Sequence, residues 1–212
     1  MMDKIKLYQN DIPANFKASS NIMAIDTETM GLNLDRDRLC VFQFSFGDGD
    51  AHLVQFTEDT DYEATNLKKL LENDEIVKLF HFARFDILAI KKYLGVMINN
   101  VYCTKIASRL ARTYTNYHSL KALVFEICGI KMDKFQQSSD WGQETLSRAQ
   151  LEYAANDVLY LHDIKKRLDE MLVRVGRMHL AQDCFAFLQT RTELDDLGWG
   201  DFDIFQHSDD QS

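Results

Sequence analysis

Strand-like apolar segments fill the first half of this sequence and helical patterns fill most of the second half, and that division restricts the fold more than any other feature. Residues 22–28 predict a buried strand, and residues 39–46 and 52–56 predict two more. Gly47 and Gly49 mark the turn between the last two. We interpret the three segments as an antiparallel meander.

Strand and helix patterns then alternate along the chain. Residues 64–71 predict a helix, residues 76–82 an apolar strand, residues 83–94 a second helix, and the region near Val101 a short strand. Beyond Thr104 the pattern is helical almost throughout. Such an alternation is typical of an α/β core.

Capping residues locate the later helices. Ser119 is suited to begin a helix and Gly129 to end it. Ser147 is suited to begin a long helix that runs towards Val173. A last helix is expected over roughly residues 178–194.

The composition favours one domain. With 212 residues and a hydrophobic content of 46%, the chain can bury one substantial core, and no linker-like stretch divides it. We predict a single domain over residues 1–207 and a polar, disordered tail over residues 208–212. No apolar run follows Met1, and no window approaches ~18 consecutive apolar residues. We therefore expect a cytoplasmic protein without a membrane span.

The formal net charge of −9 counts against a protein that grips long nucleic acid through its phosphates, because such binding depends on many Lys and Arg contacts. Carboxylates that bind metal ions add to the negative count, however, so the acidity alone does not exclude a nucleic-acid enzyme. The four cysteines stand singly, without metal-ligand spacing, and are expected to be reduced thiols.

Four carboxylates form the candidate metal site. Asp26 and Glu28 stand two apart at the end of an apolar strand, so both face the same side; a polar strand exit explains these two acids at least as well. Asp86 falls in the first turn of a helix beside a strand end, where it could also serve the helix dipole. Tyr153 and Asp157 stand four apart and share a helix face, as residues of an ordinary amphipathic helix also do.

Taken together, these positions are more specific than any one of them. Hard cations such as Mg²⁺ prefer several oxygen ligands, and four carboxylates from one strand and two helices could converge on two ions, Mg²⁺ or Mn²⁺. In a two-metal scheme the ions activate a water and stabilise the leaving oxygen of a phosphodiester. Tyr153 would then position the attacking water.

The same residues resemble the motifs of the DEDD exonuclease superfamily, which implies a ribonuclease H-like fold with a mixed central sheet flanked by helices. The third motif resembles that of the tyrosine group, Tyr-x-x-x-Asp, at Tyr153 and Asp157. The histidine group would require His where this chain has Glu152.

Two families within the tyrosine group resemble this chain. Residues 136–141 (QQSSDW) and 151–160 (LEYAANDVLY) are similar to ribonuclease D, but the chain ends before that family's C-terminal RNA-binding domains. The resemblance to nano-RNase C extends from residues 26–29 (DTET) through 103–108 (CTKIAS) to 203–205 (DIF). It implies a metal-dependent 3′-5′ exoribonuclease that degrades short RNA, especially dinucleotides, as a ring-shaped homo-octamer.

Several further residues are hypothetical substrate contacts. The segment 105–121 contains basic residues and no acid, and part of it could meet substrate phosphate; a solvated helical face or a subunit contact explains any one member equally well. Leu32 could wedge between bases, as short-RNA exonucleases resembling this chain suggest, or pack in the core. Thr27 and His81 adjoin the proposed metal ligands, although structural hydrogen bonding would also explain them. The basic segment supplies Lys105, Arg109, Arg112, His118 and Lys121.

Three alternatives to a short-RNA exonuclease are open. A general ribonuclease D-like trimmer would act on longer RNA or on DNA 3′ ends. A catalytically silent nucleic-acid-binding module would need none of the four carboxylates or Tyr153, all of which are present. A phosphoesterase for small phosphate esters would cleave a monoester in preference to a dinucleotide.

Overall fold

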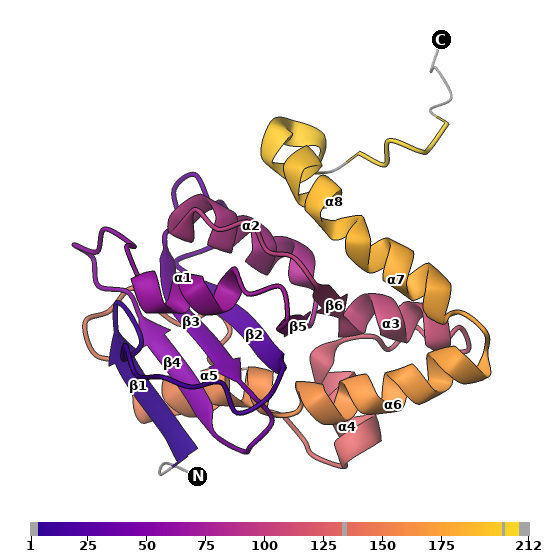
Figure 1. Cartoon of the computed structure of the whole chain (residues 1–212), viewed down its shortest axis with the longest axis horizontal. Coiled ribbons are helices and arrows are strands. Elements are labelled where there is room, and N and C mark those ends of the chain that lie inside the picture. Colours follow the sequence, from indigo (N-terminus) through magenta and orange to yellow (C-terminus); the bar gives the residue numbers. More distant parts are fainter. Residues whose placement is uncertain (1–3, 133–134, 201, 208–212) are drawn as a thin grey trace.

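The computed structural model describes residues 4–132, 135–200 and 202–207 and shows an α/β fold. Within these residues one sheet has six strands in the order β1-β4-β3-β2-β5-β6 (Figure 1). The predicted tail, residues 208–212, lies outside the described residues. The strands are β1 (Ile5–Gln9), β2 (Ile22–Thr29), β3 (Leu39–Ser45), β4 (Ala51–Gln55), β5 (Val77–Phe80) and β6 (Val101–Cys103).

The predicted mixed sheet is confirmed. Strands β2, β3 and β4 pair antiparallel, as the meander requires, while β5 pairs parallel with β2 and β6 pairs parallel with β5. The carboxyl ends of β2, β5 and β6 therefore meet at one edge of the sheet. This is the edge at which open α/β sheets commonly bind ligands.

The sequence patterns did not predict β1, which pairs parallel with β4 at one margin of the sheet. Three of its five residues are exposed, because an edge strand is covered by a neighbour on one side only. Ile5–Gln9 therefore lacks the nearly continuous apolar run that identifies the inner strands.

Helices cover both faces of the sheet. In Figure 1, α1 and α2 lie in front of the strands and α5 lies behind them, while α7 and α8 extend beyond the sheet as one arm. No helix within the described ranges combines the length and the apolar character needed to cross a bilayer. The helices are α1 (Thr65–Leu71), α2 (Ala83–Leu94), α3 (Thr104–Ala111), α4 (Leu120–Cys128), α5 (Arg148–Leu159), α6 (Leu161–Arg174), α7 (Met178–Ala186), α8 (Leu188–Leu194) and the π-helical turn η2 (Asp195–Trp199).

The predicted caps are present. The hydroxyl of Ser119 accepts a hydrogen bond from the backbone N–H of Ala122 at the start of α4, and Gly129 ends that helix in the left-handed conformation. Ser147 and Gln150 form a capping box at the start of α5.

Two predicted helices are each divided in the structure. The predicted helix from Ser147 towards Val173 is broken at Tyr160, and the predicted helix over 178–194 is broken at Phe187. Neither break contains Pro or Gly, so no local signal marks it. The first break follows from packing, because α5 lies against β2, β3 and β4, whereas α6 packs chiefly against α3 and α4.

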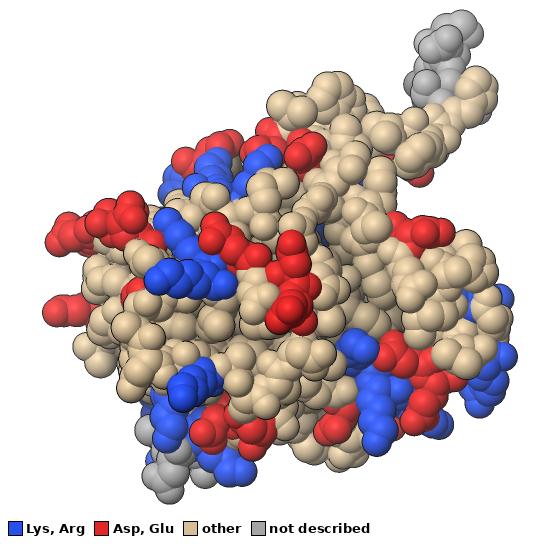
Figure 2. All heavy atoms as spheres, viewed as in Figure 1, with Lys and Arg blue, Asp and Glu red and all other residues tan. Residues whose placement is uncertain are grey.

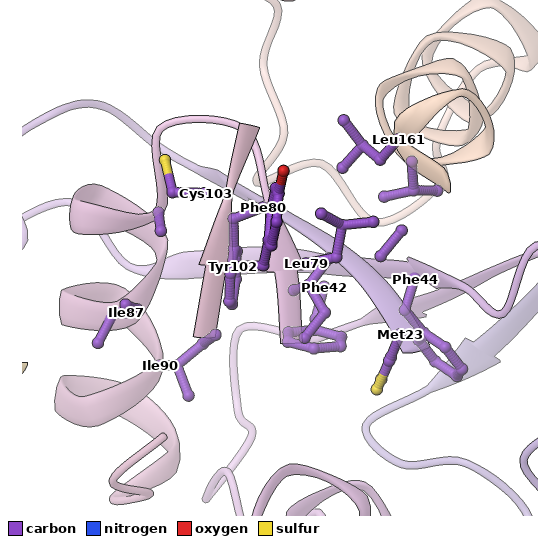
Figure 3. Close-up of a cluster of buried hydrophobic side chains, with 14 of the residues drawn as sticks. Met23, Phe42, Phe44, Leu79, Phe80, Ile87, Ile90, Tyr102, Cys103 and Leu161 are labelled. Atoms are coloured by element: carbon purple, nitrogen blue, oxygen red, sulfur yellow. The ribbon is translucent and has the colours of Figure 1, made fainter. Parts of the chain in front are cut away.

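The core explains why the strands carry nearly continuous apolar runs. Every residue of β3 is buried, because helices cover both faces of the sheet. Figure 3 shows side chains from the strands, such as Phe42 and Leu79, packed with Ile87 and Ile90 of α2 and Leu161 of α6. This packed core positions the strand ends at which the acidic residues lie.

Candidate active site

Three carboxylates converge at the end of β2. Asp26 and Glu28 come from alternate positions of the strand, and Asp157 reaches them from α5. One oxygen from each carboxylate lies within 4.8 Å of the other two. The period of two in β2 and the packing of α5 on β2 thus bring together residues more than 120 positions apart in sequence.

Asp86 joins this site from the first turn of α2. The hydroxyl of Thr27 donates a hydrogen bond to Asp86 Oδ1 at 2.6 Å, and both residues are buried. Thr27 lies between Asp26 and Glu28 in β2 and points to the opposite side of the strand. It therefore links the α2 side of the site to the two acids on the α5 side.

The electrostatics of the cluster favour cations. Burial raises the pKa of Asp26 to about 7. Burial, followed by the charges of Asp26, Asp157 and Asp86, raises the pKa of Glu28 well above its usual range. Burial and the charge of Asp26 raise the pKa of Asp86 in the same way.

Protein cations do not neutralise these acids. None of the ion pairs found within residues 4–132, 135–200 and 202–207 involves Asp26, Glu28 or Asp86. Half-buried and buried carboxylates crowded in this way fit hard divalent cations, which take oxygen ligands and replace the missing positive charge. The donor set thus suits Mg²⁺ or Mn²⁺.

Gln43 is a site residue that the sequence analysis missed. It sits directly opposite Asp26 in the β2–β3 pairing, and its Nε2 donates a hydrogen bond to Asp26 Oδ2 at 2.6 Å. Its Oε1 is buried and has no hydrogen-bond partner within the described chain. Gln43 therefore orients the Asp26 carboxylate, and only knowledge of the strand register could have identified it.

Tyr153 lies one helical turn before Asp157 on α5. Its ring packs against that of Trp141, with a centroid separation of 6.1 Å. Burial raises the pKa of Tyr153, and the charges of Asp157 and Glu28 raise it further, so the hydroxyl stays protonated at neutral pH. Tyr153 can therefore donate a hydrogen bond but cannot accept a proton as a base.

The carboxylates lie in a cleft of about 740 Å³. Apolar side chains line it beside the acids, and three of these, Met30, Leu32 and Phe82, are exposed, Leu32 to 87%. This exposure excludes core packing for Leu32. The lining comprises Asp26, Thr27, Glu28, Thr29, Met30, Gly31, Leu32, His81, Phe82, Phe85, Asp86, Lys105, Ser119, Leu120, Lys121, Met132, Gln137, Ser138, Ser139, Trp141, Tyr153 and Asp157.

The structure brings five of the hypothetical substrate contacts into the cleft: Thr27, Leu32, His81, Lys105 and Lys121. Thr27 has its hydroxyl committed to Asp86. The Nζ of Lys105 lies 4.3 Å from the centre of the Phe82 ring, a cation–π contact.

Three others are not part of the cleft lining. Arg109 is exposed on α3. Arg112 is wholly buried, and its guanidinium donates to Ser108 Oγ, to the Tyr117 carbonyl and to Glu126. His118 Nδ1 lies 2.8 Å from Ser108 Oγ.

The position of Arg112 corrects the expectation that it reaches substrate. Its side chain is fully enclosed, and its Nη1 and Nη2 donate to α3, to the 112–119 loop and to α4, while its buried Nε has no hydrogen-bond partner among the described residues. Arg112 thus supports this loop, whose last residue, Ser119, lines the cleft.

The sequence matches the 3′-5′ exonuclease family over residues 9–173. A structure of Brucella melitensis NrnC bound to pGG is 50% identical to this chain, with a TM-score of 0.92, and the match covers 97% of this chain and 99% of that one. Brucella melitensis NrnC with bound Mg²⁺ is 49% identical, with a TM-score of 0.91, over 97% of this chain and 100% of that one. These matches confirm the resemblance to nano-RNase C.

Two longer proteins are similar to this chain over only part of their own length. DNA polymerase I of Aquifex aeolicus is 37% identical over 155 residues, which are 73% of this chain and 25% of that protein. Ribonuclease D of Bartonella henselae is 31% identical over 170 residues, which are 80% of this chain and 41% of that protein. The chain spans less than half the length of these curated relatives.

Proposed function

The chain belongs to the 3′-5′ exonuclease family and, within it, to the NrnC nucleases, and from that premise we propose that it hydrolyses short RNA, dinucleotides above all. The products would be nucleoside 5′-monophosphates released from the 3′ end. The observation that carries this proposal is the carboxylate cluster of Asp26, Glu28 and Asp157 within one cleft. Residues 1–207 would act as one exonuclease domain.

The size of the cleft supports a short substrate. Sites for small ligands typically have volumes of roughly 300–1,000 Å³, and this cleft measures about 740 Å³. A relative with 50% identity has been captured with pGG, which is a ligand of that small size.

The charge distribution points the same way. On the face shown in Figure 2, Lys and Arg are interspersed with Asp and Glu and form no continuous basic track. A protein that holds long RNA by its backbone needs many phosphate contacts, each from a basic residue. The net charge of −9 agrees with a substrate that offers few phosphates.

We propose two divalent cations, Mg²⁺ or Mn²⁺, as cofactors held by Asp26, Glu28, Asp86 and Asp157. Such ions, when bound, supply a nucleophilic water at neutral pH and stabilise negative charge on the phosphate oxygens. The structure of Brucella NrnC with bound Mg²⁺ supports the choice of metal.

The protein's own groups would then orient the reactants. The protonated hydroxyl of Tyr153 would hold the attacking water by a hydrogen bond, while Gln43 keeps the Asp26 carboxylate in place. Lys105, on the cleft wall, would offer positive charge to a substrate phosphate. The exposed Leu32 would contact a base.

A time course with 5′-labelled RNAs of two and seven nucleotides, each with Mg²⁺, Mn²⁺ or EDTA, tests the proposal. Metal-dependent cleavage that strongly favours the dinucleotide is expected. Asp26→Asn should abolish it, while Asp59→Asn, an exposed acid outside the cleft, should not. A ladder from the 3′ end of the longer RNA, or of a matching DNA, would indicate a general ribonuclease D-like trimmer instead.

Two other outcomes would reject the proposal. Absence of cleavage with either metal would favour a silent binding module. Faster hydrolysis of a chromogenic phosphate monoester than of the dinucleotide would favour a phosphoesterase. The octameric assembly and the cytoplasmic location stay predictions.

A further inference from the structure

Hydrogen bonds determine which ring nitrogen of His81 carries the proton. It follows β5 at the sheet edge that carries the carboxylates, and its Nδ1 lies 2.8 Å from Thr104 Oγ1. The Thr104 hydroxyl in turn donates to the carbonyl of Phe80 at 3.1 Å. A threonine hydroxyl has only one proton to donate. Since that proton goes to Phe80, the proton between Thr104 and His81 must belong to Nδ1.

The other ring nitrogen of His81 is consequently a lone-pair acceptor. In a neutral imidazole with a proton on Nδ1, Nε2 carries none. Burial and the charge of Lys105 lower the pKa of His81 to about 3, so the ring stays neutral under ordinary conditions. His81 therefore presents an acceptor rather than a donor.

This acceptor is open to the contents of the cleft. Among the described residues, Nε2 makes no hydrogen bond, and it is not one of the buried polar atoms that lack a partner. The His81 side chain lines the same cleft as the carboxylates. A substrate group that fills the cleft can thus reach a fixed acceptor there.

The backbone next to His81 is strained. Phe82 adopts φ 71° and ψ 47°, a left-handed conformation that is unfavourable for a bulky residue, and the residue is 44% exposed and lines the cleft. Such strain persists where the surrounding structure enforces it, often at functional sites. Here it forms the turn between β5 and α2 from which His81 enters the cleft.

We infer that His81 Nε2 accepts a hydrogen bond from a ribose hydroxyl beside the scissile phosphate; recognition of a 2′-hydroxyl would favour RNA over DNA, whereas recognition of the terminal 3′-hydroxyl would not. The inference rests on the proposed function. Phosphate oxygens are acceptors and would be repelled by this lone pair. The donors attached nearest to a phosphodiester are the 2′-hydroxyls of the two sugars and the terminal 3′-hydroxyl, whereas base N–H groups lie farther away.

The test uses four dinucleotides: the all-ribose form and forms that lack the 2′-hydroxyl of the first sugar, the 2′-hydroxyl of the second, or the terminal 3′-hydroxyl. The measured quantity is kcat/KM for wild-type protein and variants. Loss of the recognised hydroxyl is expected to lower the wild-type value by about tenfold, as one hydrogen bond implies. The three deoxy forms identify which hydroxyl it is.

His81→Phe should lower kcat/KM for the all-ribose form by about tenfold and leave the matching deoxy form nearly unchanged, so that the preference disappears. His179→Phe, at an exposed position on α7 outside the cleft, is the control and should keep it. Thr104→Val should also weaken the preference, because without the threonine hydroxyl either ring nitrogen of His81 can carry the proton. Thr104→Ser keeps a hydroxyl at this position and should retain the preference. The Thr104 pair decides the question if His81→Phe does not fold.

Two results would overturn the inference. One is a wild-type enzyme that cleaves all four dinucleotides at the same rate. The other is a folded His81→Phe variant whose preference for ribose is unchanged. A wild-type protein that cleaves none of them with Mg²⁺ or Mn²⁺ rejects the proposed function itself, which is a separate outcome.

Discussion

Replacing Asp26 by Asn should stabilise the metal-free protein while destroying its activity. Asp26 is held among Glu28, Asp86 and Asp157, and burial raises its pKa to about 7. An acid whose pKa is higher in the folded state than in the unfolded state lowers stability once it is ionised. Asn removes that charge and can still accept the hydrogen bond from Gln43 through its amide oxygen.

The size of this effect follows from the pKa. The shift from the ordinary value of 3.8 to about 7 corresponds to about 4 kcal/mol when both states are ionised, at ~1.4 kcal/mol per unit. This loss of stability is absent at pH values below the pKa of the unfolded state and reaches its full size at pH values above the pKa of the folded state. At pH 5 less than half of it remains. Burial of the Asn amide offsets part of the gain, which leaves about 2 kcal/mol at pH 8, or roughly 4–8 °C in Tm for a chain of this size.

Thermal melts at pH 5 and pH 8, each with EDTA or Mg²⁺, measure this effect. In EDTA at pH 8 Asp26→Asn should melt above wild type, and the gap should shrink at pH 5. Mg²⁺ should raise the Tm of wild type more than that of the variant, because the variant has lost a ligand. Asp59→Asn should change none of these values. A lower Tm for Asp26→Asn in EDTA at pH 8, or a gain independent of pH, would refute the reasoning.

Three further substitutions test single contacts. Tyr153→Phe should lower kcat about 10- to 100-fold with little change in KM, because the hydroxyl is proposed to act only on the attacking water; an effect on KM alone would contradict this. Gln43→Leu should weaken the activation of the enzyme by Mg²⁺ about 10-fold or more, because it removes the hydrogen bond that orients Asp26. It should not lower Tm, because it also removes a buried oxygen that has no partner among the described residues. Unchanged Mg²⁺ activation would exclude the orienting role. Leu32→Ala should leave Tm unchanged and raise KM for dinucleotides about 10-fold. The control Leu197→Ala, at an exposed position outside the cleft, should change neither quantity. An unchanged KM in Leu32→Ala would remove Leu32 from the substrate contacts.

Local periodicity allowed the sequence to predict the acidic centre. The alternation of β2 places Asp26 and Glu28 on one side, and the four-residue spacing on α5 places Tyr153 and Asp157 on one helical face. The bounds predicted for α2, 83–94, are those found. In each case the deciding information lies within a few residues of the side chain.

Residues whose roles depend on distant neighbours could not be assigned in this way. A guanidinium group can donate hydrogen bonds to phosphate, and it can donate equally well to buried carbonyls and carboxylates. The sequence of a basic segment therefore does not reveal which of its basic residues is buried. Arg112 is enclosed, and Tyr117 and Glu126, from the following loop and helix, accept hydrogen bonds from its Nη1 and Nη2. Gln43 likewise contacts Asp26 only through the β2–β3 register.

His81 shows how such a distant neighbour can determine chemistry. The residue alone could donate or accept a hydrogen bond, and its position beside the acids made either choice plausible. The hydroxyl of Thr104, 23 residues later, removes the ambiguity, because parallel pairing of β5 with β6 brings it to Nδ1 and to the Phe80 carbonyl together. Local sequence therefore selects the groups that can react, while the pairing of strands and helices decides which atom of each group faces the substrate.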